Sequence, residues 1–221
     1  MIKFKKSRSA IDDLLKVMAI LRSPEGCPWD REQDHVTLRF HAVEEVYELM
    51  DAIEAADDHD MAEELGDLLL QVVFHCQLAN ERGVFDFEKV AREMTEKLLR
   101  RHPHVFGDSD AKTVDAVWAQ WDKIKHAEKQ GTHRERTSVF DGIPKHLPAL
   151  MRAEKVIKKA RKAKLLTDRT SGSLSKKAVA EQLYSLAAYA QAKGWSAEDL
   201  LLGDLKKREK SWRKKERSTL R

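Results

Sequence analysis

The sequence predicts an all-α protein. Nine glycines and five prolines in 221 residues are few for a β-rich chain, which needs many turns. Apolar residues recur at steps of three and four over long stretches, the spacing that places them on one face of a helix. A charged share of 35% indicates many solvated helix faces. We therefore expect a bundle of helices.

The first three predicted helices are bounded by turn-forming residues. A helix at about residues 9–22 has its apolar positions on one face, and Pro24 opens the loop that follows it. A second helix, at about 37–56, carries an apolar stripe. A short acidic turn separates it from a third helix at about 61–82, which stops at Gly83.

The same reasoning predicts five more helices. An aspartate caps the helix at 86–101, and another follows at about 113–130. A connector without helical periodicity then leads to a helix at about 149–164. Two final helices are expected at about 176–193 and 196–217. Gly194 separates them, and Ser196 caps the second.

Composition also bounds the location and the class of the protein. No apolar stretch reaches the roughly 18–20 uncharged residues that a membrane span requires. The basic N-terminus turns amphipathic at once and lacks the apolar core of a signal peptide. Two cysteines, Cys27 and Cys76, fit a reducing compartment better than a disulfide scaffold. We expect a cytoplasmic protein with no membrane partner.

Charge is distributed unevenly along the chain. Residues 151–221 hold 20 Lys and Arg against 8 Asp and Glu, a net charge of +12, whereas residues 1–150 carry −8. One interpretation is an acidic half that binds metal ions, joined to a basic half. The other is the ordinary unevenness of helical surfaces.

Carboxylates gather on the second and third predicted helices. Glu44, Glu45 and Glu48 fall within an arc of about 100° beside the apolar stripe of their helix. Glu64 and Asp67 lie on the third helix, whose other faces are apolar. A helix that is apolar all round is a buried helix, so we expect these carboxylates to be satisfied inside the protein.

A divalent cation explains this arrangement better than salt bridges do. Glu64 and Asp67 have no local partner, because residues 61–81 contain no Lys or Arg. Isolated buried carboxylates would become protonated, whereas several that converge suit a hard cation. Oxygen ligands without cysteine favour magnesium or manganese over zinc. Gln71 and His75 continue the same polar line, and we expect His75 to make a buried hydrogen bond.

The motifs EEVYE and EELGDLLLQVVFH, with GCPWDREQ before and KLLRRHPHVF after them, resemble those of the MazG family of nucleoside triphosphate pyrophosphohydrolases. The resemblance runs from about Leu21 to Lys129, with the motifs in the family's order and spacing. It implies an all-α, usually dimeric fold around a metal site. It also implies cleavage of a nucleoside triphosphate between the α and β phosphorus, with Mg²⁺ required and Mn²⁺ as a substitute.

Carried over residue by residue, the resemblance assigns metal binding to Glu45, Glu48, Glu64 and Asp67. It implies that Glu44 and Glu48 are catalytic, by orienting or deprotonating the water that attacks the α-phosphorus. An alternative role for Glu44 is to hold a second ion.

The resemblance also implies four substrate-binding residues. Lys97 and Arg101 match a basic pair that meets the phosphates. Trp121 and Lys125 match a Trp-x-x-x-Lys element, in which the ring stacks on the base or walls the pocket and the amine meets a phosphate. The plainer alternatives are solvated positions for Lys97 and Arg101, and core packing for Trp121.

The second half resembles a decayed copy of the first. We expect a catalytic domain over residues 1–130, a linker over 131–148 and a degenerate, non-catalytic helical module over 149–221. Where a copy would carry Glu-x-x-Asp, the chain has Ala178 and Glu181. This half therefore lacks the ligands for a metal site of the same kind.

The sequence is also compatible with other functions. A house-cleaning hydrolase for non-standard nucleotides or dUTP would use the same site. A non-enzymatic regulator that binds nucleotides or nucleic acid would use the basic C-terminal half, including residues 205–217. Di-iron bundle proteins are disfavoured, since their sites use Glu-x-x-His. From the resemblance we expect a nucleoside triphosphate substrate and a homodimer. We do not expect a nucleic acid partner, because basic helices are more often solvated faces.

Overall fold

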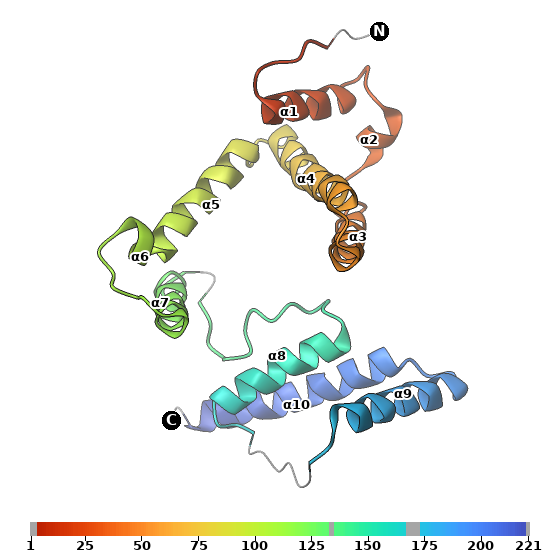
Figure 1. The fold of residues 1–221 in the computed structure, drawn as a ribbon, viewed down its shortest axis with the longest axis vertical. Coiled ribbons are helices and arrows are strands. Elements are labelled where there is room, and N and C mark those ends of the chain that lie inside the picture. Colours follow the sequence, from red (N-terminus) through yellow and green to blue (C-terminus); the bar gives the residue numbers. More distant parts are fainter. Residues whose placement is uncertain (1–3, 133–134, 167–172, 220–221) are drawn as a thin grey trace. The chain divides into compact units, whose positions relative to one another are not determined.

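The computed structural model describes residues 4–132, 135–166 and 173–219, which form helices and no strand within these ranges (Figure 1). The all-α prediction is confirmed. The helices are α1 (Ala10–Leu21), α2 (Pro28–Glu32), α3 (His41–Ala55), α4 (Asp58–Glu81), α5 (Phe87–Arg101), α6 (Pro103–Phe106), α7 (Val114–Ala127), α8 (Ala149–Lys162), α9 (Lys176–Ala192) and α10 (Ala197–Thr219).

All eight predicted helices are present, and their ends differ for local reasons. α3 starts four residues later than expected because the Asp34 carboxylate accepts hydrogen bonds from the N–H groups of Val36 and Thr37, which forms a turn there. α4 starts earlier because the Asp57 side chain caps it, accepting hydrogen bonds from the backbone N–H groups of His59 and Asp60. Such a cap contributes about 1 kcal/mol. α2 and α6 are short helices in expected loops, each with a proline in its first turn.

The chain divides into two compact units, unit 1 over residues 1–121 and unit 2 over residues 122–221. This division falls inside α7. The expected functional limits of 1–130, 131–148 and 149–221 remain a prediction.

Unit 1 is built on a helical hairpin of α3 and α4, which lie side by side (Figure 1). The turn between them is only Ala56 and Asp57, and Ala56 adopts the left-handed conformation, with φ 55°. α1 packs on the C-terminal half of α4, which creates the core of this unit. Its buried members are Met18, Leu38, Val73, Phe74 and Leu78.

The expectation that α4 is buried all round is wrong for its first half. Leu65 and Leu69 are 50% and 39% exposed, and the buried residues of α4 begin only at Gln71. The reason is that α1 covers α4 only from Leu70 onward. The apolar stripe of α3 is exposed as well, at Val43, Val46, Tyr47, Met50 and Ile53.

Unit 2 contains α8, α9 and α10, and its core lies between α8, α10 and the connector that precedes α8. Figure 1 shows α8 and α9 each lying along α10. The Trp212 ring stacks on Phe140, with 5.9 Å between ring centroids, and both side chains are buried. Among the helices that the structure describes, none combines the length and apolar character needed to cross a membrane.

Candidate metal centre

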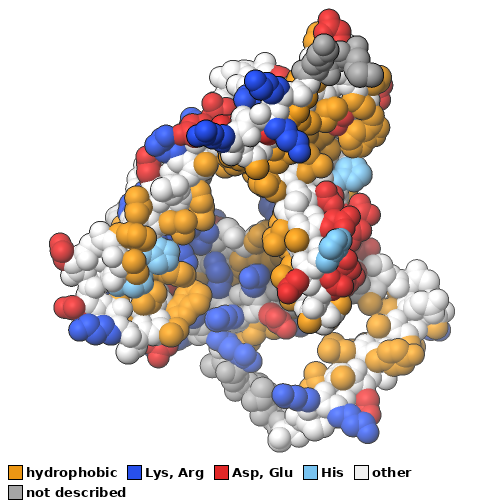
Figure 2. Space-filling model, turned by 45° about the horizontal axis from the view of Figure 1, so that its top comes forward, with side chains coloured by type: hydrophobic (Ala, Val, Ile, Leu, Met, Phe, Trp, Pro, Cys, Tyr) orange, Lys and Arg blue, Asp and Glu red, His pale blue; other side chains and the backbone are white. Residues whose placement is uncertain are grey.

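The α3–α4 hairpin brings three of the predicted metal ligands together. One carboxylate oxygen from each of Glu45, Glu48 and Glu64 lies within 4.8 Å of the others. Glu45 and Glu64 are half-buried and Glu48 is exposed. Figure 2 shows Asp and Glu side chains gathered in one patch over this part of the molecule. The cluster therefore has an enclosed side and a side that solvent can reach.

The electrostatics of this cluster are unfavourable without a cation. Burial raises the pKa of Glu45, and the Asp67 carboxylate raises it further. The pKa of Glu64 is also raised, first by burial and then by Glu48 and Asp67. Within the described residues, none of the three clustered glutamates forms an ion pair with Lys or Arg. The negative charges of these carboxylates are thus held close together at a site with limited access to water.

Two buried oxygens at this cluster lack hydrogen bonds. Glu64 Oε2 is enclosed and has no hydrogen-bond partner among the described residues, and the same holds for Gln71 Oε1. Gln71 Nε2 donates to Glu45 Oε1 at 3.3 Å, which fixes that carboxylate. A buried polar atom without a partner costs about 1–3 kcal/mol, and more when it is charged. A hard divalent cation would remove this cost, so these residues fit such an ion.

Asp67 and Glu44 occupy the margins of the cluster. Asp67 is half-buried and close enough to raise the pKa values of Glu45 and Glu64, although it is outside the tight group of three oxygens. Glu44 is exposed, and its carboxylate lies 3.6 Å from His41 Nδ1. Its position suits contact with a solvent molecule better than burial against an ion.

The predicted substrate-binding residues lie on α5 and α7. Lys97 and Arg101 are one helical turn apart on α5, and both are half-buried. On α7, Trp121 packs edge-on against His102, with ring centroids 5.0 Å apart, and against Trp118 at 5.4 Å. Sequence reasoning missed Trp118, although its place three residues before Trp121 puts both rings on one helix face.

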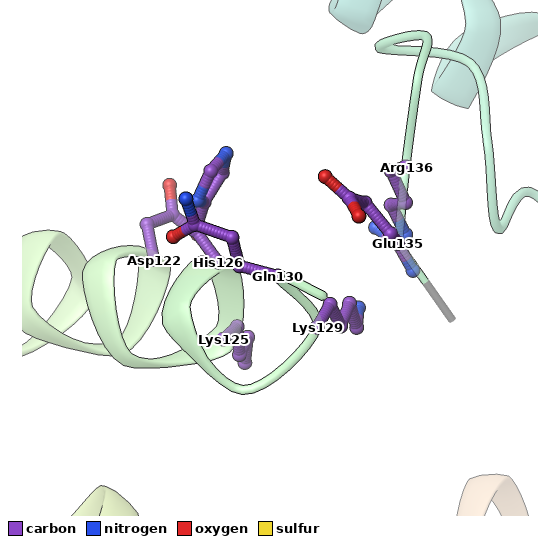
Figure 3. A pocket seen from close by; sticks show the side chains of 7 residues that line it. All are labelled: Asp122, Lys125, His126, Lys129, Gln130, Glu135 and Arg136. Carbon is purple, nitrogen blue, oxygen red and sulfur yellow. The ribbon is translucent and has the colours of Figure 1, made fainter. Parts of the chain in front are cut away.

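Lys125 lines a cavity of about 230 Å³ in unit 2, between the end of α7 and the segment after it. Figure 3 shows Asp122, His126 and Gln130 on one side of this cavity and Glu135 with Arg136 on the other. None of the predicted metal ligands is among its lining residues. Acidic and basic side chains both line this cavity, so its charge does not by itself indicate a phosphate site. A phosphate contact by Lys125 therefore remains a prediction.

A chain of three side chains joins α4 to the segment before α3. His75 Nδ1 lies 2.8 Å from His35 Nδ1, and the two rings are stacked. Arg82 Nη2 lies 2.9 Å from His35 Nε2. Because arginine can only donate, His35 accepts at Nε2 and donates from Nδ1 to His75, so both rings are neutral. Burial and His35 lower the pKa of His75.

The expected buried hydrogen bond of His75 is confirmed in this partly buried contact. Sequence reasoning missed His35 and Arg82 as its partners. No spacing rule could have found the contact, because His35 and His75 are 40 residues apart.

Other candidate groups are weaker. His59, Asp60 and Glu63 also approach one another, but all three are exposed at the start of α4. In unit 2, α9 carries Ala178 and Glu181 where a second copy would need two carboxylates. Over the described parts of the chain, both groups of residues with metal-binding geometry lie in unit 1.

The fold and the site together define an all-α protein whose helical hairpin presents a carboxylate cluster suited to a divalent cation. Residues 33–106 match the family model of the MazG nucleotide pyrophosphohydrolase domain. Residues 33–106 of the chain are therefore a MazG domain. The matched segment contains the four predicted metal ligands and both members of the basic pair of α5, but not Trp121 or Lys125.

Several curated bacterial proteins are similar to this chain. A nucleoside triphosphate pyrophosphohydrolase of Escherichia coli is 49% identical over 150 residues, which cover 67% of this chain and 56% of that protein. The nucleoside triphosphate pyrophosphohydrolase/pyrophosphatase MazG of Thermotoga maritima is 47% identical, over 69% of this chain and 57% of its own length. A nucleoside triphosphate pyrophosphohydrolase of Mycobacterium tuberculosis is 41% identical, over 69% of this chain and 45% of its own length. The chain thus spans about half the length of these relatives.

Proposed function

We propose that this protein hydrolyses nucleoside triphosphates to a nucleoside monophosphate and pyrophosphate, with Mg²⁺ as cofactor and Mn²⁺ as a substitute. The observation that carries this proposal is the enclosed Glu64 Oε2, which has no hydrogen-bond partner in the described structure and lies beside two further carboxylates. The names of the similar proteins support the same activity.

In this proposal Glu45, Glu48 and Glu64 hold the metal, and Asp67 completes the ligand set. The bound ion would neutralise charge on the phosphate oxygens and lower the pKa of a coordinated water. Gln71 has a positioning role, since its amide holds one oxygen of Glu45. The half-buried ligands set the geometry, while Glu48 is exposed and so can be reached by a substrate from solvent.

Glu48 and Glu44 serve as the catalytic carboxylates. Glu48 accepts the proton of the attacking water, and Glu44 orients that water by a hydrogen bond. The water oxygen forms a bond to the α-phosphorus, and the bond from that phosphorus to the bridging oxygen breaks. Pyrophosphate leaves with the electron pair of the broken bond. Both carboxylates are exposed to solvent, so they can reach a water molecule without a movement of the backbone.

The substrate is held by side chains of α5 and α7. Lys97 and Arg101 bind the β and γ phosphates, and Lys125 adds a further positive charge. Trp121, with Trp118 against its edge, provides an aromatic wall for the nucleobase. The α5 pair is supported by its position inside the segment that matches the family.

We further propose that the protein is a homodimer whose second copy covers the exposed stripe of α3. Val46, Tyr47 and Met50 are 42%, 51% and 49% exposed, and contiguous apolar surface of this kind marks an interaction site. Changing Val46 to Glu should produce monomers, measured by light scattering after size exclusion. Val84→Glu is the matched control, since Val84 is an exposed valine outside the helices.

For residues 149–221 we propose a structural, non-catalytic role, because α9 lacks the carboxylate pair. A cytoplasmic location is also proposed. It is supported by Cys27 and Cys76, which are both free.

The direct test is the identity of the product. The full chain is incubated with Mg²⁺ and a panel of ribo- and deoxyribonucleoside triphosphates, including dUTP. Pyrophosphate and orthophosphate are then assayed separately. Pyrophosphate with the matching monophosphate is the expected result. Release of orthophosphate would mean a different cleavage position, and no release from any member of the panel would contradict the proposed activity.

A further inference from the structure

A basic groove lies in unit 2, between the connector before α8 and one face of α10. Its volume is about 710 Å³. Seven Lys and Arg side chains line it, against one carboxylate, that of Glu209. Five of these seven cations are Lys145, Lys206, Lys210, Lys214 and Arg217.

Structural ion pairs account for only two of the seven cations. Arg152 Nη2 contacts Glu209 at 2.7 Å, and Arg213 binds both Glu209 and Asp141, at 2.8 and 2.6 Å. The five cations named above have no ion pair or hydrogen bond within the described residues. The groove therefore has a large excess of positive charge.

The spacing of these cations indicates an extended ligand. Lys206, Lys210 and Lys214 follow one another at steps of four on α10, so they form a row on one helix face. At 1.5 Å per residue, successive members are about 6 Å apart along the helix axis. That distance is close to the separation of neighbouring phosphates along a stretched nucleic acid strand. A small anion would instead require cations that converge on one point.

We propose that this groove binds single-stranded nucleic acid through its phosphate backbone. The only tryptophan of α10, Trp212, is buried against Phe140 and cannot stack on a base. Binding should therefore be independent of base sequence and strongly weakened by salt. A protein partner is disfavoured, because Leu202 is the only aliphatic residue in the lining and a protein interface needs buried apolar anchors.

This inference replaces the expectation that nucleic acid is not a partner. That expectation rested on the usual solvation of basic helices. The structure adds a hollow whose lining has a large excess of positive charge, and such a hollow raises the local concentration of a polyanion more than a convex helix does.

The test uses the full chain and a fluorescent oligothymidylate of about 16 nucleotides, with binding followed by anisotropy. The groove variant Lys206→Gln/Lys210→Gln/Lys214→Gln should bind at least about tenfold more weakly at low salt. The slope of log affinity against log salt concentration should become less negative by about 2, since each lost phosphate contact removes roughly 0.7 from its magnitude. The control variant Lys155→Gln/Lys158→Gln/Lys176→Gln removes the same charge from exposed positions outside the groove and should bind like the wild type.

Further measurements separate charge from structure. Lys206→Arg/Lys210→Arg/Lys214→Arg keeps the row of charge and should keep the affinity. Pyrophosphate release by the groove variant should equal that of the wild type, so a failure of the proposed catalytic activity is recognised separately. The proposal is overturned by absence of binding at low salt, by equal binding of the groove variant, by loss of binding in the arginine variant, or by equal affinity for polyglutamate or a DNA duplex of the same charge.

Discussion

Two regions of the molecule, the α3–α4 hairpin of unit 1 and the α8–α10 contact of unit 2, treat their partly buried charges in opposite ways. In unit 2, the Arg152 and Glu209 side chains are 8% and 13% exposed, and they form an ion pair at 2.7 Å. Arg152 also donates to the carbonyl oxygen of Pro144, and Arg213 bridges Glu209 to Asp141. In unit 1, the α3–α4 hairpin holds three glutamates close together, and none of them pairs with a Lys or Arg among the described residues.

The pKa values record the same contrast. Burial alone would raise the pKa of Asp141, but hydrogen bonds from Arg213 and the Ser138 N–H outweigh it, so that pKa is lowered. For Glu45 and Glu64, burial and neighbouring carboxylates act together and raise the pKa values. Charges that are satisfied within the chain stabilise the fold, whereas like charges without partners mark the place of a ligand.

The largest expected effect tests the unpaired cluster. Glu64→Gln should lower pyrophosphate release at least about a thousandfold, equivalent to about 4 kcal/mol in the barrier, because the site loses an anionic ligand. Glu63→Gln is the matched control, since it makes the same change at the adjacent, exposed position. Near-normal turnover by Glu64→Gln, measured by pyrophosphate assay, would remove Glu64 from the metal site.

The paired network should respond in stability and not in catalysis. Arg152→Met removes one of the two arginines that pair with Glu209, and the loss of such a charged hydrogen bond should lower the unfolding free energy by about 1.5–3 kcal/mol. Urea denaturation of the full chain measures this loss. The control is Arg208→Met, whose pair with Asp204 is exposed and should contribute at most about 1 kcal/mol. Equal stability of the two variants would contradict a stabilising role for the charge network of α8 and α10.

Metal binding should stabilise the wild type and not the Glu64→Gln variant. At a Mg²⁺ concentration 100 times its Kd, the gain in unfolding free energy is about 2.7 kcal/mol. The ligands bind Mg²⁺ only when deprotonated, and the pKa values of Glu45 and Glu64 are raised. The Mg²⁺-induced rise in Tm should therefore shrink as the pH falls toward the ordinary glutamate pKa of 4.5. A shift independent of pH would argue against carboxylate ligands.

The smallest expected effect concerns the neutral contact of His75 with His35. Its folded-state pKa is below the ordinary value of 6.5, so the unfolded chain binds more protons at mildly acidic pH. The contribution of His75 to stability is thus complete above pH 6.5 and decreases as the pH falls toward the lowered value. Thermal melts of wild type and His75→Gln should converge on acidification. A constant difference between them would contradict the neutral assignment.

Much of this architecture could be predicted from local patterns. Apolar periodicity and caps such as Asp86 located the eight long helices, and the positions of Glu45, Glu48 and Glu64 predicted that their oxygens would meet. Periodicity identifies an apolar face but not what covers it, which is why the exposure of Leu65 was not foreseen. The contact between His35 and His75 depends on tertiary packing alone.

The two-residue turn at Ala56 and Asp57 sets the relative registration of the helices that it joins. An inserted residue that joined the start of α4 would turn the side chains after it by about 100° and shift them by about 1.5 Å along the helix. Glu64 would then face away from Glu45, although every side chain of the site would still be present. The length of this connection is therefore as much a requirement for the site as the identity of its acidic residues.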